Sequence, residues 1–120
     1  MQEAEGILEH EVIDGVHVFR LRMTGLEDRI ALLAFEDAMD QLLKESKEPP
    51  RIVVNLGQVE YLLTTALAKL VSFRVRVHKR KGTFVLCCLR PAVQEVMKIA
   101  GFDELFSISK SESRAIARAR

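Results

Sequence analysis

Two adjacent hydroxyl residues, Thr64 and Thr65, are the side chains of this sequence whose placement most clearly suggests chemistry. They follow a β-branched run and a short spacer, and they open a segment whose apolar residues recur with helical spacing. At a helix start, a threonine oxygen is well placed to accept a hydrogen bond from an unpartnered backbone N–H group. A phosphate attached there would lie at the positive end of the helix dipole. We therefore expect these threonines to cap a helix, and the open question is whether the cap also acts as a phosphate switch.

Other residue types that carry chemistry do not form recognisable sites. The six glycines form neither a Walker loop nor a dinucleotide fingerprint, and no Gly-x-Ser-x-Gly elbow is present. Cys87 and Cys88 are adjacent, which is poor geometry for a mutual disulfide, so we expect two reduced thiols. His10, His17 and His78 show no metal-ligand spacing with them. The sequence thus predicts no metal, no cofactor and no enzymatic activity, and favours a binding or regulatory module.

Length and charge narrow the class further. With 120 residues and 48% hydrophobic content, the chain is long enough for one core, so we expect a single domain over residues 1–120. The net charge of +1 argues against a nucleic-acid partner. No apolar run reaches the roughly 18 residues of a membrane span, and the acidic N-terminus lacks a signal-peptide core. We expect a cytoplasmic protein without membrane association.

One basic run admits a second interpretation, because its cations could form a phosphate or nucleic-acid patch. Its residues are Arg74, Arg76, Lys79, Arg80 and Lys81. No aromatic residue lies among them, and a solvated helix face that ends in cations explains them better.

The elements that must position the threonines follow from periodicity and turn signals. We predict a hairpin about Asp14–Gly15, helices over 28–45, 64–80, 91–100 and 113–120, and strands over 51–56, 83–89 and 107–108. Gly82 and Gly101 should end two helices, while Ser109 and Glu112 should form a capping box before a weakly amphipathic last helix. Alternating strands and helices predict an α/β fold with a mixed, largely parallel sheet of four to five strands, an N-terminal hairpin and about four helices.

Several segments together match a family pattern that covers nearly the whole chain. They are Asn55–Gly57 at a strand end, Leu63–Leu67 at a helix start, Gly82–Leu86, Arg90–Val96, Gly101–Phe106, and the pair Gly25 and Asp28. In this combination the chain resembles a STAS domain, the fold of bacterial anti-sigma factor antagonists. The resemblance implies that Thr64 occupies the position of the phosphorylated hydroxyl residue. Leu63 replaces the acidic residue before it.

The resemblance implies a non-enzymatic interaction module in a partner-switching circuit. Its partner would be an anti-sigma factor with a kinase-type fold, with a serine/threonine phosphatase as a further partner. The residues implied in binding are Glu60, Leu63, Ala66, Leu67 and Asp28, with Thr65 as helper cap and alternative acceptor. Two alternatives stay open. The threonines could cap the helix without modification, and the chain could be a constitutive scaffold or self-associating subunit, including a weak homodimer.

Overall fold

The computed structural model describes residues 8–24 and 28–120. The strands are β1 (Leu8–Ile13), β2 (Val16–Met23), β3 (Arg51–Val59), β4 (Thr83–Cys87) and β5 (Ser107–Ser109). The helices are α1 (Asp28–Glu45), α2 (Thr64–Lys79), α3 (Pro91–Ile99) and α4 (Glu112–Ala119). The predicted α/β fold is confirmed, since these strands form one mixed sheet with an N-terminal hairpin.

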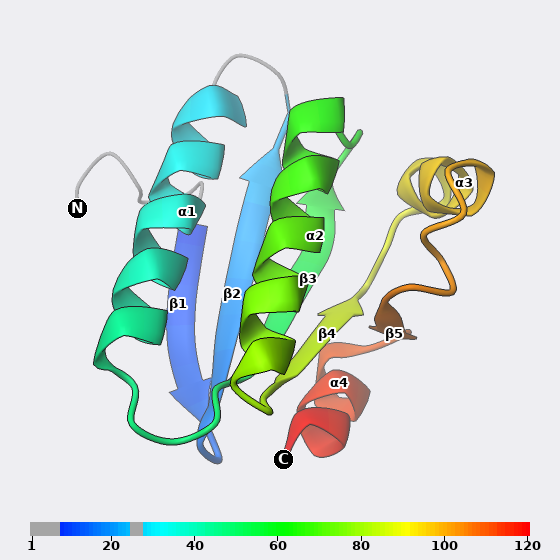
Figure 1. The fold of residues 1–120 in the computed structure, drawn as a ribbon. Coiled ribbons are helices and arrows are strands. Elements are labelled where there is room, and N and C mark those ends of the chain that lie inside the picture. The colour runs from blue at the N-terminus through cyan, green and yellow to red at the C-terminus, as the bar shows by residue number, and fades with distance from the viewer. Residues whose placement is uncertain (1–7, 25–27) are drawn as a thin grey trace.

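The sheet order equals the chain order, β1-β2-β3-β4-β5, and every pair except β1 with β2 is parallel. Right-handed crossovers that step through the sheet in one direction place their helices on one face. Accordingly α1, α2 and α3 bury apolar residues in one common core, whereas α4 packs on the opposite face (Figure 1). At the hairpin turn, Asp14 and Gly15 both have positive φ, 53° and 78°, as a type I′ turn requires.

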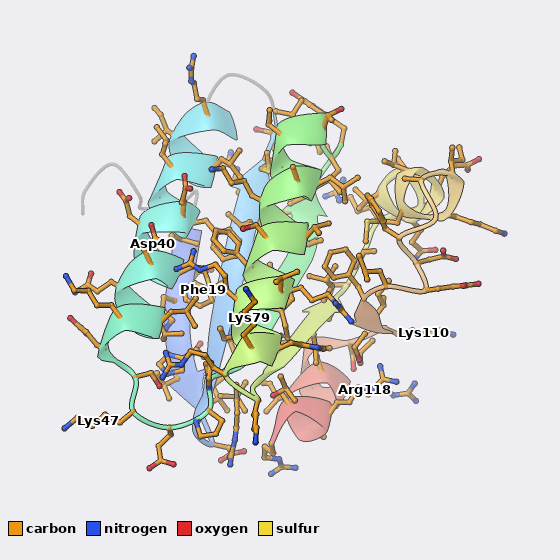
Figure 2. The ribbon with its side chains drawn as sticks, viewed as in Figure 1. Phe19, Asp40, Lys47, Lys79, Lys110 and Arg118 are labelled. Atoms are coloured by element: carbon orange, nitrogen blue, oxygen red, sulfur yellow. The ribbon has the colours of Figure 1, made fainter. Side chains whose placement is uncertain are left out.

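The core on the α1–α2 face is built around three phenylalanines. The Phe35 ring meets Phe19 and Phe73 edge-on, with ring centroids 5.5 and 5.1 Å apart. Figure 2 shows Phe19 beneath the two helices. Ion pairs Lys69–Glu36 and Arg76–Asp40 bridge α2 and α1 above this core. Each of the two helices buries one apolar stripe, and the central residues of both stripes are buried.

The C-terminal helix differs from its prediction. α4 is strongly amphipathic and buries Ala115, Ile116 and Ala119 against the second face of the sheet. Its N-cap is Ser111, whose hydroxyl accepts a hydrogen bond from the Arg114 N–H group at 3.2 Å. The predicted capping box is therefore wrong, because Ser109 is taken up by β5.

The ends of two strands also differ from their predicted positions. β3 runs three residues further than predicted, and β4 ends at Cys87 because Cys88 adopts a positive φ of 64°. After α2, the left-handed residue is Lys81, with φ 61°, and not Gly82. Glycine is required at position 82 because a larger residue does not fit, since a Cβ there would lie 2.1 Å from the Pro50 carbonyl oxygen.

α3 buries a narrower stripe than its sequence suggests. Val93 and Met97 are fully buried, whereas Val96 is 38% exposed and Ile99 is 79% exposed.

Among the described helices, none is both long and apolar enough to cross a membrane.

Candidate functional site

The start of α2 presents the tandem threonines to solvent. Thr64 and Thr65 are the first two residues of the helix, and both side chains are exposed. The N-cap residue is Leu63, whose carbonyl accepts from the Leu67 N–H group at 2.9 Å. The Leu63 side chain makes no capping hydrogen bond. The prediction that the threonines cap α2 is therefore wrong, and with it the helper-cap role of Thr65.

The missing cap has an electrostatic consequence. The leucine side chain at the N-cap has no oxygen atom, so the first-turn N–H groups have no side-chain acceptor in the part of the chain that the structure describes. The first turn also contains no acidic residue. Among the described residues, neither threonine hydroxyl makes a hydrogen bond. The amino end of α2 is thus open to an added negative charge, which its dipole favours.

The residues before the helix form an exposed, partly apolar loop. Tyr61 is 42% exposed and Leu63 is 37% exposed, and Glu60 is also exposed. The Glu60 N–H group donates to the Met23 carbonyl at 2.9 Å, which ties the loop to the end of β2. Tyr61 was not foreseen from sequence, although an aromatic residue next to a predicted loop is a usable signal for a contact surface.

The remaining predicted contact residues divide into two groups. Ala66 and Leu67 are only 2% and 8% exposed and belong to the core, so little of either side chain is accessible to a partner, and their role in binding stays a prediction. They face the sheet because a helix lying on a sheet must bury one stripe, and these residues carry it. Asp28 begins α1 at the same end of the sheet as Thr64 (Figure 1). Its side chain and Gly25 lie outside the described residues.

A bulge in β3 positions the chain that leads into the loop. Opposite Leu21 of β2, β3 contains two residues, Leu56 and Gly57, because the register shifts between Arg20 and Arg22. The Gly57 N–H group donates to the Asn55 side chain at 2.8 Å, and its carbonyl accepts from the Arg90 guanidinium at 2.9 Å. Gly57 is therefore held from both sides.

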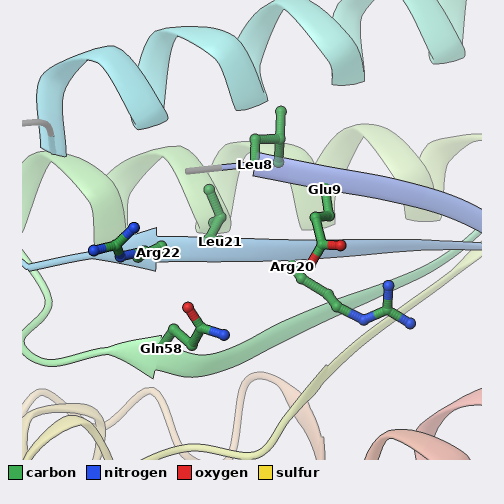
Figure 3. Close-up of a pocket in the computed structure, with 6 residues that line it drawn as sticks. All are labelled: Leu8, Glu9, Arg20, Leu21, Arg22 and Gln58. Atoms are coloured by element: carbon green, nitrogen blue, oxygen red, sulfur yellow. The ribbon is translucent and has the colours of Figure 1, made fainter. Parts of the chain in front are cut away.

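Asn55 also connects this bulge to the C-terminal helix. Its amide nitrogen donates to Glu112 at 2.8 Å, and Arg20 donates to both oxygens of the same carboxylate at 2.8 Å. Two sets of hydrogen bonds hold the pKa of Glu112 below its ordinary value, and those from Arg20 have a larger effect than the one from Asn55. Arg20 also lines a small cavity of about 230 Å³ with Glu9, Arg22 and Gln58 (Figure 3).

The other residues that could carry chemistry have structural roles or lack a suitable arrangement. Arg76 pairs with Asp40, and Arg80 donates to the carbonyls of Leu43 and Ser46, so two members of the basic run are engaged within the fold. Both cysteines are free thiols, and burial raises the pKa of Cys87, which disfavours its nucleophilic thiolate. No group of three potential metal ligands occurs in the part of the chain that the structure describes.

Comparison with known proteins agrees with this architecture. The family model of the STAS domain matches residues 7–115. A Bordetella bronchiseptica protein named as an anti-sigma factor antagonist, BtrV, is 33% identical over 67 residues, which cover 56% of this chain and 58% of BtrV. The solved structure of an anti-sigma factor antagonist domain protein from Planctomyces limnophilus superposes with a TM-score of 0.80. It is 20% identical and is matched over 95% of this chain and 98% of its own.

A second solved structure has the same fold with an added phosphate. It is the Bacillus cell-fate determinant SpoIIAA in its phosphorylated form, with a TM-score of 0.70, 16% identity, and coverage of 94% of this chain and 99% of that one. At such identities the structural likeness concerns the fold, while the family model covers nearly the whole chain. The chain belongs to the STAS domain family.

Proposed function

We propose that this protein is a non-enzymatic interaction module of the anti-sigma factor antagonist type, switched by phosphate on Thr64. In its unmodified form, the loop Glu60–Leu63 and the start of α2 bind an anti-sigma factor with a kinase-type fold. That partner phosphorylates Thr64, and a serine/threonine phosphatase reverses the modification. The names of the relatives support this role, and proteins of this family are generally non-enzymatic.

The observation that carries the proposal is the exposure of Thr64 at the uncapped amino end of α2. A phosphate there adds about −1.5 to −2 charges at neutral pH. The free domain tolerates this charge, because first-turn N–H groups without a side-chain cap stabilise it. A partner packed against Tyr61 and Leu63 must bury the same charge beside an apolar contact. A coupling of about 1–3 kcal/mol would weaken binding by about 5- to 150-fold.

The test combines modification and binding. The protein is incubated with ATP and a kinase-type anti-sigma factor from its own organism, and the modified residue is identified by mass spectrometry. Affinities are then measured for the wild type, Thr64→Ala, Thr64→Glu and the matched control Thr65→Ala. We expect phosphate on Thr64, weak binding of Thr64→Glu alone, and near wild-type binding of the other two. Equal affinity of all four proteins would eliminate the switch.

A second candidate function rests on the exposed apolar loop. Tyr61 and Leu63 suit a permanent contact, and Leu63 stands where a charge would otherwise meet the partner. In this role the chain is a constitutive scaffold or self-associating subunit. Light scattering after size-exclusion chromatography distinguishes the two, because self-association should produce a dimer that Leu63→Ser weakens. A monomer at high micromolar concentration would count against it.

A further inference from the structure

A basic depression lies between β5 and α4, on a part of the surface that the proposed switch does not use. Its volume is about 530 Å³, within the range of ligand sites. It is lined by Ile108, Ser109, Lys110, Arg114, Ala117 and Arg118. Half of these residues are cations, although the whole chain has a net charge of only +1. Figure 2 shows Lys110 and Arg118 extending from this side of the molecule.

The Arg118 guanidinium is held in place by the edge strand. Its Nη1 atom donates to the Ile108 carbonyl at 3.0 Å and to the Ser109 hydroxyl at 3.3 Å. These two contacts leave the edge formed by Nε and Nη2 without a partner among the described residues. That edge is the part of a guanidinium that binds a phosphate or carboxylate through two parallel hydrogen bonds.

The outer edge of β5 adds a main-chain donor. The Ser109 carbonyl accepts from Cys88, at the end of β4, so the backbone groups of Ile108 face the other way, out of the sheet. Arg118 covers the outward carbonyl of Ile108. The neighbouring N–H group of Ile108 faces the same side and is positioned to bind an extended peptide.

The charges of the depression are not balanced within the described part of the fold. Other cations are paired with carboxylates, including Arg20 with Glu112, Lys69 with Glu36 and Arg76 with Asp40. Lys110 and the Arg114 guanidinium have no such partner among the described residues. The one carboxylate of α4, Glu112, is already bound by Arg20 and Asn55.

We propose that this depression binds a phosphorylated segment of a partner protein. The phosphate monoester is bound by the free edge of Arg118, with Arg114 and Lys110 neutralising its second charge. The Ile108 N–H group binds the peptide main chain beside it. None of the lining residues is aromatic, so there is no stacking platform for a nucleobase, and this favours a phosphopeptide over a nucleotide. The site does not depend on Thr64.

The experiment uses the full ¹⁵N-labelled chain and a pentapeptide with a central phosphothreonine, whose other residues carry no charge. We expect saturable amide shifts confined to β5 and α4, which weaken as salt rises. Arg114→Gln should reduce affinity about tenfold, the loss of one charge-assisted contact. Arg114 is exposed, so this variant should melt like the wild type. Arg74→Gln, which removes a charge from α2, is the matched control and should bind normally.

Four results would overturn the proposal. They are the absence of saturable shifts at millimolar peptide, equal binding of the unmodified peptide, equal binding of inorganic phosphate at the same concentration, and an affinity of Arg114→Gln equal to that of Arg74→Gln. Loss of the Thr64 switch in the earlier experiment would leave all of these readouts unchanged, so the two proposals fail separately.

Discussion

Replacement of Glu112 by alanine should destabilise the protein by removing a polar link between α4 and the sheet. The Glu112 carboxylate accepts three hydrogen bonds at 2.8 Å, two from Arg20 and one from Asn55. Its side chain is 24% exposed and that of Arg20 is 27% exposed, so solvent screens the pair only in part. Arg20 retains its contact with Glu11 at 2.8 Å in the variant, which limits the loss.

The magnitude follows from these contacts. Hydrogen bonds to a charged group contribute about 1.5–3 kcal/mol each when buried, and exposed ion pairs contribute about 0–1 kcal/mol. For a partly buried carboxylate with three donors, one of which keeps another partner, we expect a net loss of about 2 kcal/mol. In a chain of this length that corresponds to a fall in Tm of about 8 °C.

The effect should depend on pH in a defined direction. The folded pKa of Glu112 lies below its ordinary value, so the carboxylate stabilises the fold above the unfolded pKa of about 4.3. That contribution disappears as pH falls through the folded pKa. Urea unfolding of the wild type and Glu112→Ala should therefore differ by about 2 kcal/mol at pH 7, and the difference should shrink below about pH 4.

A difference below about 0.5 kcal/mol, typical of an ordinary surface substitution, would refute this account. So would a difference that stays constant down to about pH 3. The matched control is Glu95→Ala on α3, because Glu95 is exposed and makes no side-chain hydrogen bond among the described residues. It should unfold like the wild type across the same pH range.

Three further substitutions test local features by urea unfolding. Gly82→Ala should cost more than about 2 kcal/mol, because its Cβ would lie 2.1 Å from the Pro50 carbonyl oxygen, a backbone atom that cannot yield cheaply. Lys81→Gly should stabilise by about 0.5–1 kcal/mol, because glycine adopts the observed φ of 61° without strain. Burial lowers the pKa of both His10 and His17, so stability should fall as pH drops through about 6.5, and His10→Gln/His17→Gln should reduce this dependence.

Each of these expectations has a control and a contradicting result. Gly15→Ala tests backbone strain alone, since nothing lies within 4 Å of a Cβ at Gly15, and it should cost less than Gly82→Ala. Equal losses would contradict the steric account. A destabilised Lys81→Gly would contradict the strain assigned to that residue. His78 is exposed on α2, so His78→Gln should leave the pH dependence of stability unchanged. A double variant His10→Gln/His17→Gln with the pH dependence of the wild type would show that these two histidines do not cause it.

At the candidate site, local sequence predicted positions better than contacts. The tandem threonines do begin α2, because the apolar stripe from Ala66 to Val77 defines where the helix starts. Their hydroxyls do not cap it, because the preceding Leu63 takes the N-cap position with extended φ and ψ. The burial of Leu67, which the sequence placed at a partner contact, has a similar reason. Its orientation depends on which helix face meets the sheet.

By itself, the sequence determined the order of elements, the hairpin turn and the extents of α1 and α2, because these follow from spacing and turn chemistry along a few neighbouring residues. Tertiary structure decided the rest. Glu112, which looked like half of a capping box, binds Arg20 and Asn55 from distant strands. α4, which looked weakly amphipathic, is held by the sheet face that the crossover helices leave uncovered. Such contacts join residues far apart in the chain, and the spacing of neighbouring residues does not predict them.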